Sequence, residues 1–217
     1  MNQPLPPRRA TCAACLRAQS ACICGWVRPL VSPVELLILQ HPLEVANAKN
    51  SARLLHLSVA GSVLAVGEAF DADALGTLLH AGGRMPVLLY PETPGVATPD
   101  TLAAAPLPLL LPLLLPLLLP ERLRLVVLDA TWRKSRKMLH LNPVLRQLPR
   151  LALSDMPASH YRIRKAHAPD QLSTLEAGAH ALGQIEGDAA RYAPLFAAFD
   201  GFVGQQAAYL PHPLPPA

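Results

Sequence analysis

Residues 125–139 read LVVLDATWRKSRKML, and this stretch joins a buried strand to a helix. The apolar run 125–128 is typical of a parallel strand that is covered on both faces. Asp129 follows this run directly, and in open α/β sheets ligands bind just beyond the carboxyl ends of the strands. After Thr131 and Trp132 a helical pattern begins that carries cations at positions 133, 134, 136 and 137. An acid and an indole beside clustered cations predict a site for a polyanionic substrate.

Strand and helix patterns alternate along the rest of the chain, which indicates an α/β fold with a mostly parallel sheet. We expect strands over 34–40, 63–69, 86–90 and 124–128, and short extended pieces over 151–154 and 161–165. We expect helices over 44–57, 72–80, 131–148, 173–190 and 194–210, the third bent near Asn142-Pro143 because proline interrupts a helix. None of the 12 glycines forms a Gly-x-Gly-x-x-Gly fingerprint, and no Gly-Lys-Ser/Thr is present, so no loop of either type is predicted to hold phosphates.

All four cysteines of the chain lie within one short segment, at positions 12, 15, 22 and 24. Four thiolates at such spacing hold one zinc ion tetrahedrally, so we predict a metal site formed by Cys12, Cys15, Cys22 and Cys24. Zinc is the first choice, with another thiophilic metal such as iron as the alternative. Disulfides are the competing interpretation, and the lack of an apolar secretion signal in MNQPLPPRRATCAAC disfavours them. A site closed by four thiolates leaves no open position, so we expect the metal to be structural or to shape an RNA-binding surface, and not to do the chemistry.

The composition describes one main domain whose basic residues are clustered. The net charge is +4, and seven of the 19 Lys and Arg residues fall in 133–137 and 162–165. Residues 106–120, PLPLLLPLLLPLLLP, are apolar, but the run is shorter than the roughly 20 residues of a membrane span and contains repeated prolines. We therefore expect a leucine and proline repeat in a connection, no membrane segment and a cytoplasmic protein.

Several candidate site residues also have a purely structural explanation. Asp129 or Thr131 could simply cap the following helix, and Trp132 could belong to the core. Ser173 and Glu176 form a Ser-x-x-Glu capping box, although a helix start also offers backbone N–H groups to a carboxylate. His41 follows the first strand, where a lone histidine is more often a hydrogen-bonded structural residue than a catalyst.

The chain resembles the DTW-domain family, the tRNA-uridine aminocarboxypropyltransferases, over nearly its whole length. The matching pieces occur in the family's order: the four cysteines; His41-Pro42-x-Glu44 with Asn50 and Arg53; Leu89-Tyr90-Pro91; Leu128-Asp129-Ala130-Thr131-Trp132; and Tyr161-Arg162-Ile163-Arg164-Lys165 with Leu172-Ser173-Thr174-Leu175-Glu176. The departures are the leucine and proline expansion, which leaves the path of residues 104–121 open, and a longer loop at 92–95.

The resemblance implies transfer of the 3-amino-3-carboxypropyl group from S-adenosylmethionine to N3 of a uridine in tRNA, with release of methylthioadenosine. It also implies a SPOUT-like sheet with a trefoil knot. Within that reaction we expect catalytic roles for Asp129, Thr131 and Trp132, with Asp129 as the general base for the N3 proton. Residues expected to bind S-adenosylmethionine are Tyr90, Pro91, Leu128, Leu172, Ser173, Thr174 and Glu176. Residues expected to contact RNA are His41, Arg53, Arg133, Arg136, Lys137, Tyr161, Arg162, Arg164 and Lys165.

Two other functions remain compatible with the sequence. One is a SPOUT-like RNA methyltransferase that uses the same donor, and the other is a zinc-bearing RNA-binding protein without catalysis. The expected organisation is a metal knuckle over residues 1–30, a catalytic domain over 31–210 and a flexible tail over 211–217.

Overall fold

The computed structural model describes residues 10–91, 119–153, 156–157, 159 and 172–209. Its strands form a five-stranded parallel sheet with the order β2-β1-β4-β3-β5. The strands are β1(Glu35–Gln40), β2(Val63–Val66), β3(Met85–Leu89), β4(Leu123–Asp129) and β5(Arg150–Leu151). The predicted α/β fold with a parallel sheet is confirmed. The extended piece expected at 161–165, most of the repeat at 106–120 and the tail at 211–217 lie outside the described residues.

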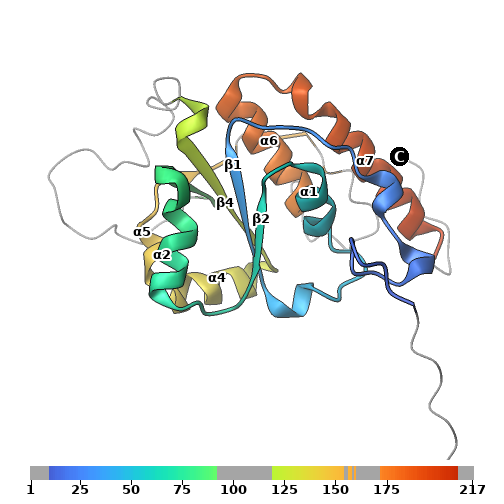
Figure 1. Ribbon diagram of the computed structural model, residues 1–217, viewed down its shortest axis with the longest axis horizontal. Helices are drawn as coiled ribbons and strands as arrows, with labels where there is room; N and C mark the ends of the chain where they lie inside the picture. The colour runs from blue at the N-terminus through green and yellow to red at the C-terminus, as the bar shows by residue number, and fades with distance from the viewer. Residues whose placement is uncertain (1–9, 92–118, 154–155, 158, 160–171, 210–217) are drawn as a thin grey trace, which may run out of the picture.

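Helices cover both faces of the sheet, as Figure 1 shows. The six helices of the described residues are α1(Ala52–Ser58), α2(Ala72–His80), α4(Trp132–Leu141), α5(Pro143–Gln147), α6(Thr174–Glu186) and α7(Ala193–Ala207). Short helical turns complete the elements, namely η1(Gln19–Ala21), η2(Cys24–Trp26), η3(Pro42–Glu44), η4(Ala81–Gly83), η6(Pro120–Arg122) and η7(Ala190–Tyr192). None of these helices in the described part of the chain combines the length and the apolar character needed to cross a membrane.

Alternation along the central strands divides the core into two clusters, because successive side chains of a strand point to opposite faces. On one face Leu125 and Val127 of β4 pack with α1, α6 and α7. On the other face Val126 packs with α2, α4 and α5. The two middle strands, β1 and β4, are therefore buried on both sides, as their apolar runs predicted.

The cysteine segment packs on the first of these clusters and not on a core of its own. Cys15 and Ile23 are buried within that cluster. Trp26 lies against α7 at Gly201, where a Cβ would come within 2.2 Å of the indole, so only glycine fits. The indole N–H also donates to Gln205 at 2.7 Å.

Two helix boundaries differ from the sequence prediction by more than three residues. The helix expected over 44–57 begins only at Ala52, after the N-cap Ser51, because residues 42–44 form the separate turn η3 and the Asn50 side-chain oxygen accepts the Ala52 amide at 3.0 Å, a local bond that competes with a helix running through residue 50. The helix expected over 173–190 ends at Glu186, because Gly187 adopts φ +67° and terminates it. The break at Asn142-Pro143, in contrast, is where it was predicted.

Candidate active site

The carboxyl ends of β1 and β4 lie next to each other at the centre of the sheet. Gln40 and Asp129 are register partners at the last position of the two strands. The chain then continues from β1 with His41, whose amide donates to the Asp129 carbonyl at 3.0 Å. Asp129 thus occupies the sheet edge at which the sequence placed the chemistry.

The Asp129 carboxylate is buried and accepts hydrogen bonds from three other segments. Its Oδ2 accepts from Gln40 Nε2 at 2.8 Å and from Asn50 Nδ2 at 2.6 Å. Its Oδ1 accepts from the Thr174 hydroxyl at 2.7 Å. A carboxylate offers about four acceptor positions, so one on Oδ1 is left unused by these bonds. Asp129 itself is 4% exposed.

Burial raises the pKa of Asp129 above its ordinary value. The hydrogen bonds from Gln40, Thr174 and Asn50 act in the opposite direction, and the nearby charge of Glu44 adds to the rise. A raised pKa means that the carboxylate binds a proton more tightly, and a general base needs this proton affinity. The interpretation of Asp129 as a mere helix cap is not supported, because the N-cap of α4 is Thr131 and the Asp129 carboxylate bonds Gln40, Asn50 and Thr174 instead. The Thr131 side chain does not cap the helix by a hydrogen bond either.

Trp132 is 51% exposed, so the interpretation as a core residue is wrong. Its ring lies edge-on to Tyr90, with centroids 5.7 Å apart. Tyr90 is buried, contacts the Ser135 hydroxyl at 3.3 Å, and has the Arg150 guanidinium 5.4 Å from its ring centroid. The structure thus brings Tyr90 and Trp132 together, and it leaves about half of the Trp132 side chain open to solvent, three residues after the buried acid.

The predicted capping box at the start of α6 is confirmed. The Ser173 hydroxyl accepts the Glu176 amide at 3.2 Å, and the Glu176 carboxylate accepts the Ser173 amide at 2.8 Å. This corrects one expectation, because the Ser173 N–H is already used and is not free for a substrate carboxylate. Within the described residues the Thr174 amide has no hydrogen-bond partner, while its hydroxyl is committed to Asp129.

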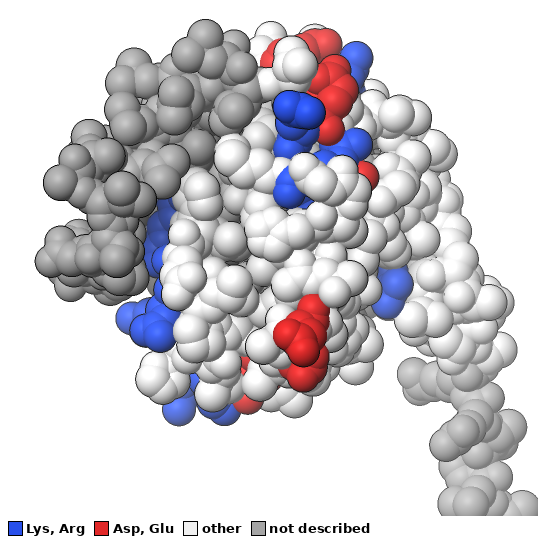
Figure 2. Space-filling view, turned by 60° about the vertical axis from the view of Figure 1, so that its left-hand side comes forward, with Lys and Arg blue, Asp and Glu red and all other residues white. Residues whose placement is uncertain are grey.

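The cations of α4 fall into two kinds. Lys134 pairs with Glu44 and Lys137 with Glu68, both at 2.8 Å. Arg133 and Arg136 are exposed and have no acidic partner among the described residues. In Figure 2, several Lys and Arg side chains lie along the lower left border of the described surface. The unpaired positive charge of this helix therefore belongs to Arg133 and Arg136.

The remaining candidates are placed as follows. His41 is buried, its Nδ1 accepts the Leu43 amide at 3.1 Å and its Nε2 contacts Glu68 at 3.0 Å, which makes it part of the Glu68 and Lys137 network. Hydrogen bonds from Lys137 and His41 lower the pKa of Glu68. Thr131, Leu128, Leu172 and Arg53 are partly buried, and Pro91 is exposed. Tyr161, Arg162, Arg164 and Lys165 lie outside the described residues.

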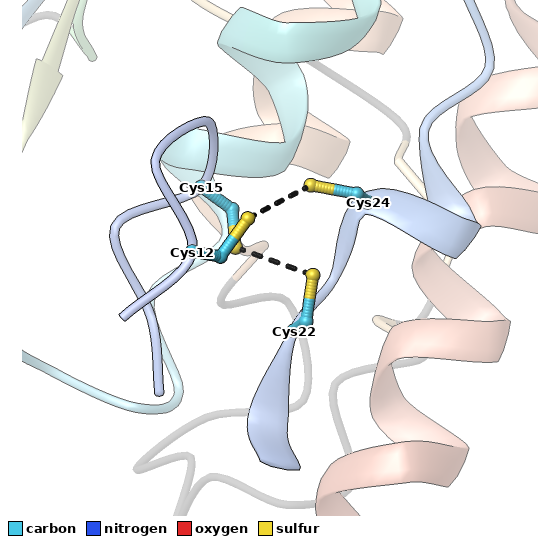
Figure 3. A group of neighbouring side chains, drawn as sticks. All are labelled: Cys12, Cys15, Cys22 and Cys24. Carbon is cyan, nitrogen blue, oxygen red and sulfur yellow. Dashed lines mark hydrogen bonds between the residues drawn. The ribbon is translucent and has the colours of Figure 1, made fainter. Parts of the chain in front are cut away.

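The four cysteine side chains converge on one point (Figure 3). Their sulfur atoms all lie within 4.8 Å of one another, and the pairs Cys12–Cys24 and Cys15–Cys22 are each separated by 3.7 Å. Zinc–sulfur bonds of about 2.3 Å at tetrahedral angles separate neighbouring sulfurs by about 3.8 Å. All four thiols are free, so the disulfide interpretation is not supported and the donor set fits a thiophilic metal ion.

The thiols also differ in acidity. Hydrogen bonds from the backbone amides of Cys15 and Ala14 lower the pKa of Cys12 to about 6. Burial and the neighbouring thiols raise the pKa of Cys24 to about 12. A bound cation would stabilise all four thiolates together, which the protein alone does not.

Sequence reasoning did not identify Gln40 and Asn50 as members of the site. Both are polar residues next to apolar or helical segments, and Gln40 ends the run VELLILQ at the same sheet edge as Asp129. Its position at a strand end was the one available signal. Asn50 was noted only as part of the segment that matches the family, and no site role was assigned to it, because its distance to Asp129 depends on the path of residues 41–51.

Comparison with known proteins identifies the family. The DTW domain matches residues 9–207, so the chain belongs to the DTW-domain family. It is 26% identical over 186 residues to a protein named tRNA-uridine aminocarboxypropyltransferase 2 from Mus musculus, covering 82% of this chain and 57% of that protein. Proteins of the same name from Macaca fascicularis and Drosophila melanogaster are 26% and 28% identical, covering 84% and 83% of this chain and 59% and 68% of theirs. The chain thus spans less than two thirds of its mammalian relatives, and no solved structure matches it.

Proposed function

We propose that this protein transfers the 3-amino-3-carboxypropyl group of S-adenosylmethionine to N3 of a uridine in tRNA. The names of its relatives supply the reaction class. The structural observation that carries the proposal is a buried carboxylate at the carboxyl edge of the sheet, on which hydrogen bonds from the described residues leave one acceptor position unused. An exposed indole, Trp132, follows it three residues later in the chain. Such a site suits removal of a proton from a flat base.

The proposed step forms a bond from N3 to carbon and an O–H bond on Asp129, and it breaks a carbon–sulfur bond and the N3–H bond. N3 attacks the terminal carbon of the aminocarboxypropyl group, the bond from that carbon to the sulfonium sulfur breaks, and methylthioadenosine leaves. Asp129 accepts the N3 proton on Oδ1, where its free acceptor position lies. Thr174, Gln40 and Asn50 orient the carboxylate by their hydrogen bonds. Thr131 and Trp132 complete the catalytic group, with the Trp132 ring stacking on a uridine that is unpaired.

S-adenosylmethionine is proposed to lie along the edge formed by the loops after β3 and β4 and the start of α6. The residues assigned to it are Tyr90, Pro91, Leu128, Leu172, Ser173, Thr174 and Glu176. Because the Ser173 amide is engaged by Glu176, the Thr174 amide is the better candidate to meet the carboxylate of the donor. Only the sulfonium carbon placed in line with N3 reacts, so these contacts decide which group is transferred.

The tRNA is proposed to approach along α4. Arg133 and Arg136 contact its phosphates, together with Arg53 and with Arg162, Arg164 and Lys165, while Tyr161 offers a second ring for stacking. Lys137 and His41 belong to the same surface, but their side chains already contact Glu68, so we assign them a secondary part.

On the family resemblance we propose a SPOUT-like knotted sheet. The cysteine spacing supports a zinc-bearing segment over residues 1–30, followed by a catalytic domain over 31–210 and a tail at 211–217, and we also propose a cytoplasmic location. When bound, the metal would hold Cys12, Cys15, Cys22 and Cys24 together and would take no part in the transfer.

A deletion strain of the source organism tests the proposed function. Nucleosides from its tRNA should lack 3-(3-amino-3-carboxypropyl)uridine, and the wild-type gene should restore that nucleoside while an Asp129→Asn gene should not. Loss and return of a methylated uridine would instead favour the methyltransferase, and an unchanged nucleoside profile would favour a protein that only binds RNA.

A further inference from the structure

Arg17 connects the cysteine segment with the rest of the molecule. Its carbonyl accepts the Cys12 amide at 2.8 Å, and the preceding Leu16 adopts φ +62° and donates its amide to the Cys12 carbonyl at 2.9 Å. The backbone of Arg17 is therefore held by the same turn that presents Cys12 and Cys15. Loosening of the cysteine cluster would release Arg17 as well.

The Arg17 guanidinium reaches out of this turn to two other segments. Its carbon lies 5.1 Å from the ring centroid of Phe202, a fully buried residue of α7. Its two terminal nitrogens donate to the carbonyls of Ala48 and Asn50, the latter at 2.7 Å. A planar guanidinium can satisfy two carbonyls and stack on a ring at once, whereas an ammonium group cannot. Arg17 thus fixes residues 48–50 against the core.

Asn50 passes this constraint on to Asp129. Its side-chain oxygen accepts the amides of Ala52 at 3.0 Å and Arg53 at 3.4 Å, at the start of α1. This contact fixes which end of the amide faces the helix, so the Nδ2 group must face Asp129, to which it donates at 2.6 Å. One side chain therefore separates the Arg17 contact from the carboxylate.

We propose that Arg17 is a positioning residue, which couples the cysteine site to Asp129 by holding the backbone of Asn50. The proposal assigns the cysteine cluster a purpose beyond local folding, because its integrity determines the orientation of an active-site hydrogen-bond donor. The effect of this role on the reaction rate rests on the proposed transferase function. The ordering of residues 45–51 by Arg17 is independent of that function.

Hydrogen exchange of the full chain, read by mass spectrometry, tests the structural part without any substrate. Arg17→Met should speed exchange of the amides in 45–51. Arg28→Met is the matched control, because Arg28 belongs to the same segment but its guanidinium, among the described residues, donates only to the carbonyls of Gly25 and Val27. The backbone amide of Arg28, which donates to the Ser58 hydroxyl, is unaffected by this replacement. In Arg17→Lys the exchange rate of these amides should lie between the rates of the wild type and Arg17→Met. Unchanged exchange of 45–51 in Arg17→Met would overturn the proposal.

Removal of the metal tests the coupling itself. A chelator should speed exchange of residues 45–51 in the wild type to about the level of Arg17→Met, and it should cause no further change there in Arg17→Met. If chelation frees the cysteines while residues 45–51 of the wild type keep their protection, Arg17 does not transmit the state of the cysteine site.

A double-mutant cycle tests the path through Asn50. Arg17→Met should lower kcat by roughly tenfold, the effect of losing about one net hydrogen bond, with little change in the KM for S-adenosylmethionine. In an Asn50→Ala background the same replacement should cause no further loss of kcat, whereas additive losses would contradict the path. If the wild type transfers no aminocarboxypropyl group, the proposed function fails, and the exchange experiments still decide the role of Arg17.

Discussion

Asp129 combines two properties that oppose each other. Burial disfavours its charged form, while three donors stabilise that form. The balance leaves a carboxylate with a raised pKa that is nevertheless held in one orientation. Both a defined direction and a raised proton affinity serve a base that removes one proton from a fixed position on a substrate.

Asp129→Asn should abolish most of the transfer and preserve the fold. The amide that replaces Oδ1 can donate to the Thr174 hydroxyl, which can accept as well as donate, so no buried group loses its partner. We expect a loss of about 10² to 10⁴-fold in the single-turnover rate, as for removal of a general base. Near wild-type turnover would exclude the assigned role, and a large drop in the unfolding temperature would identify Asp129 as structural.

The raised pKa of Asp129 also predicts how stability depends on pH. An unfolded aspartate titrates at about 3.9, so the folded protein binds this proton more tightly than the unfolded chain does. The stabilisation that comes from this tighter proton binding is fully present at pH values below the unfolded pKa. It is lost as the pH rises through the higher pKa of the folded protein. The free energy of unfolding of the wild type, measured in urea against that of Asp129→Asn, should therefore fall relative to the variant over this window. A difference that stays constant or rises would reverse the direction assigned to the pKa.

Helix α4 shows why identical charges on one helix need not have the same role. Glu44 and Glu68, from the loops after β1 and β2, neutralise Lys134 and Lys137. Arg133 and Arg136 have no such partners within the described part of the chain. The position of the acids, and not the spacing of the cations, selects the residues that are available to phosphates.

Replacement of Arg133 and Arg136 by alanine should weaken tRNA binding and flatten its salt dependence. Each phosphate contact contributes somewhat less than one unit of log–log slope, so the double variant should lose up to about two units. Lys134→Ala with Lys137→Ala removes the same charge from the same helix and should change the slope less. Filter-binding titrations over a range of salt concentrations make the comparison, and equal effects of the two pairs would show that the ion pairs do not matter.

The sequence predicts the central elements well where the periodicity is strong and the boundaries poorly where local hydrogen bonds decide. Strand β4 and the break before Pro143 were predicted because an apolar run and a proline each have one structural meaning. The start of α1 was not predicted, because Asn50 interrupts the helical pattern through a side-chain hydrogen bond to the Ala52 amide, which the residue pattern does not reveal. The donors to Asp129 come from positions 79 and 89 residues away for Asn50 and Gln40, so only the topology brings them together.

At the scale of the whole molecule, the cysteine segment belongs to the same core as the sheet. Trp26, Cys15 and Ile23 pack against the α6 and α7 layer, and Gln205 of α7 donates to the Cys22 carbonyl at 3.0 Å. The segment therefore stabilises the layer that also presents Thr174 to Asp129. The sequence showed the cysteine spacing, but not the surface on which the cluster packs.

The cysteine cluster should hold about one zinc ion per chain. Elemental analysis of protein purified without chelator measures the metal, and a thiol reagent should find four reactive groups only after chelation. Cys12→Ser should lower the metal content and the unfolding temperature, since a structural site with three thiolates binds more weakly. Four reactive thiols without chelation, together with no metal, would contradict the site.

The most direct measurement incubates the purified protein with an unmodified tRNA transcript and S-adenosylmethionine, and then analyses both products by mass spectrometry. The proposed transfer should yield 3-(3-amino-3-carboxypropyl)uridine in the tRNA and an equal amount of methylthioadenosine, and neither product should form with Asp129→Asn. Methylated uridine with S-adenosylhomocysteine would contradict it.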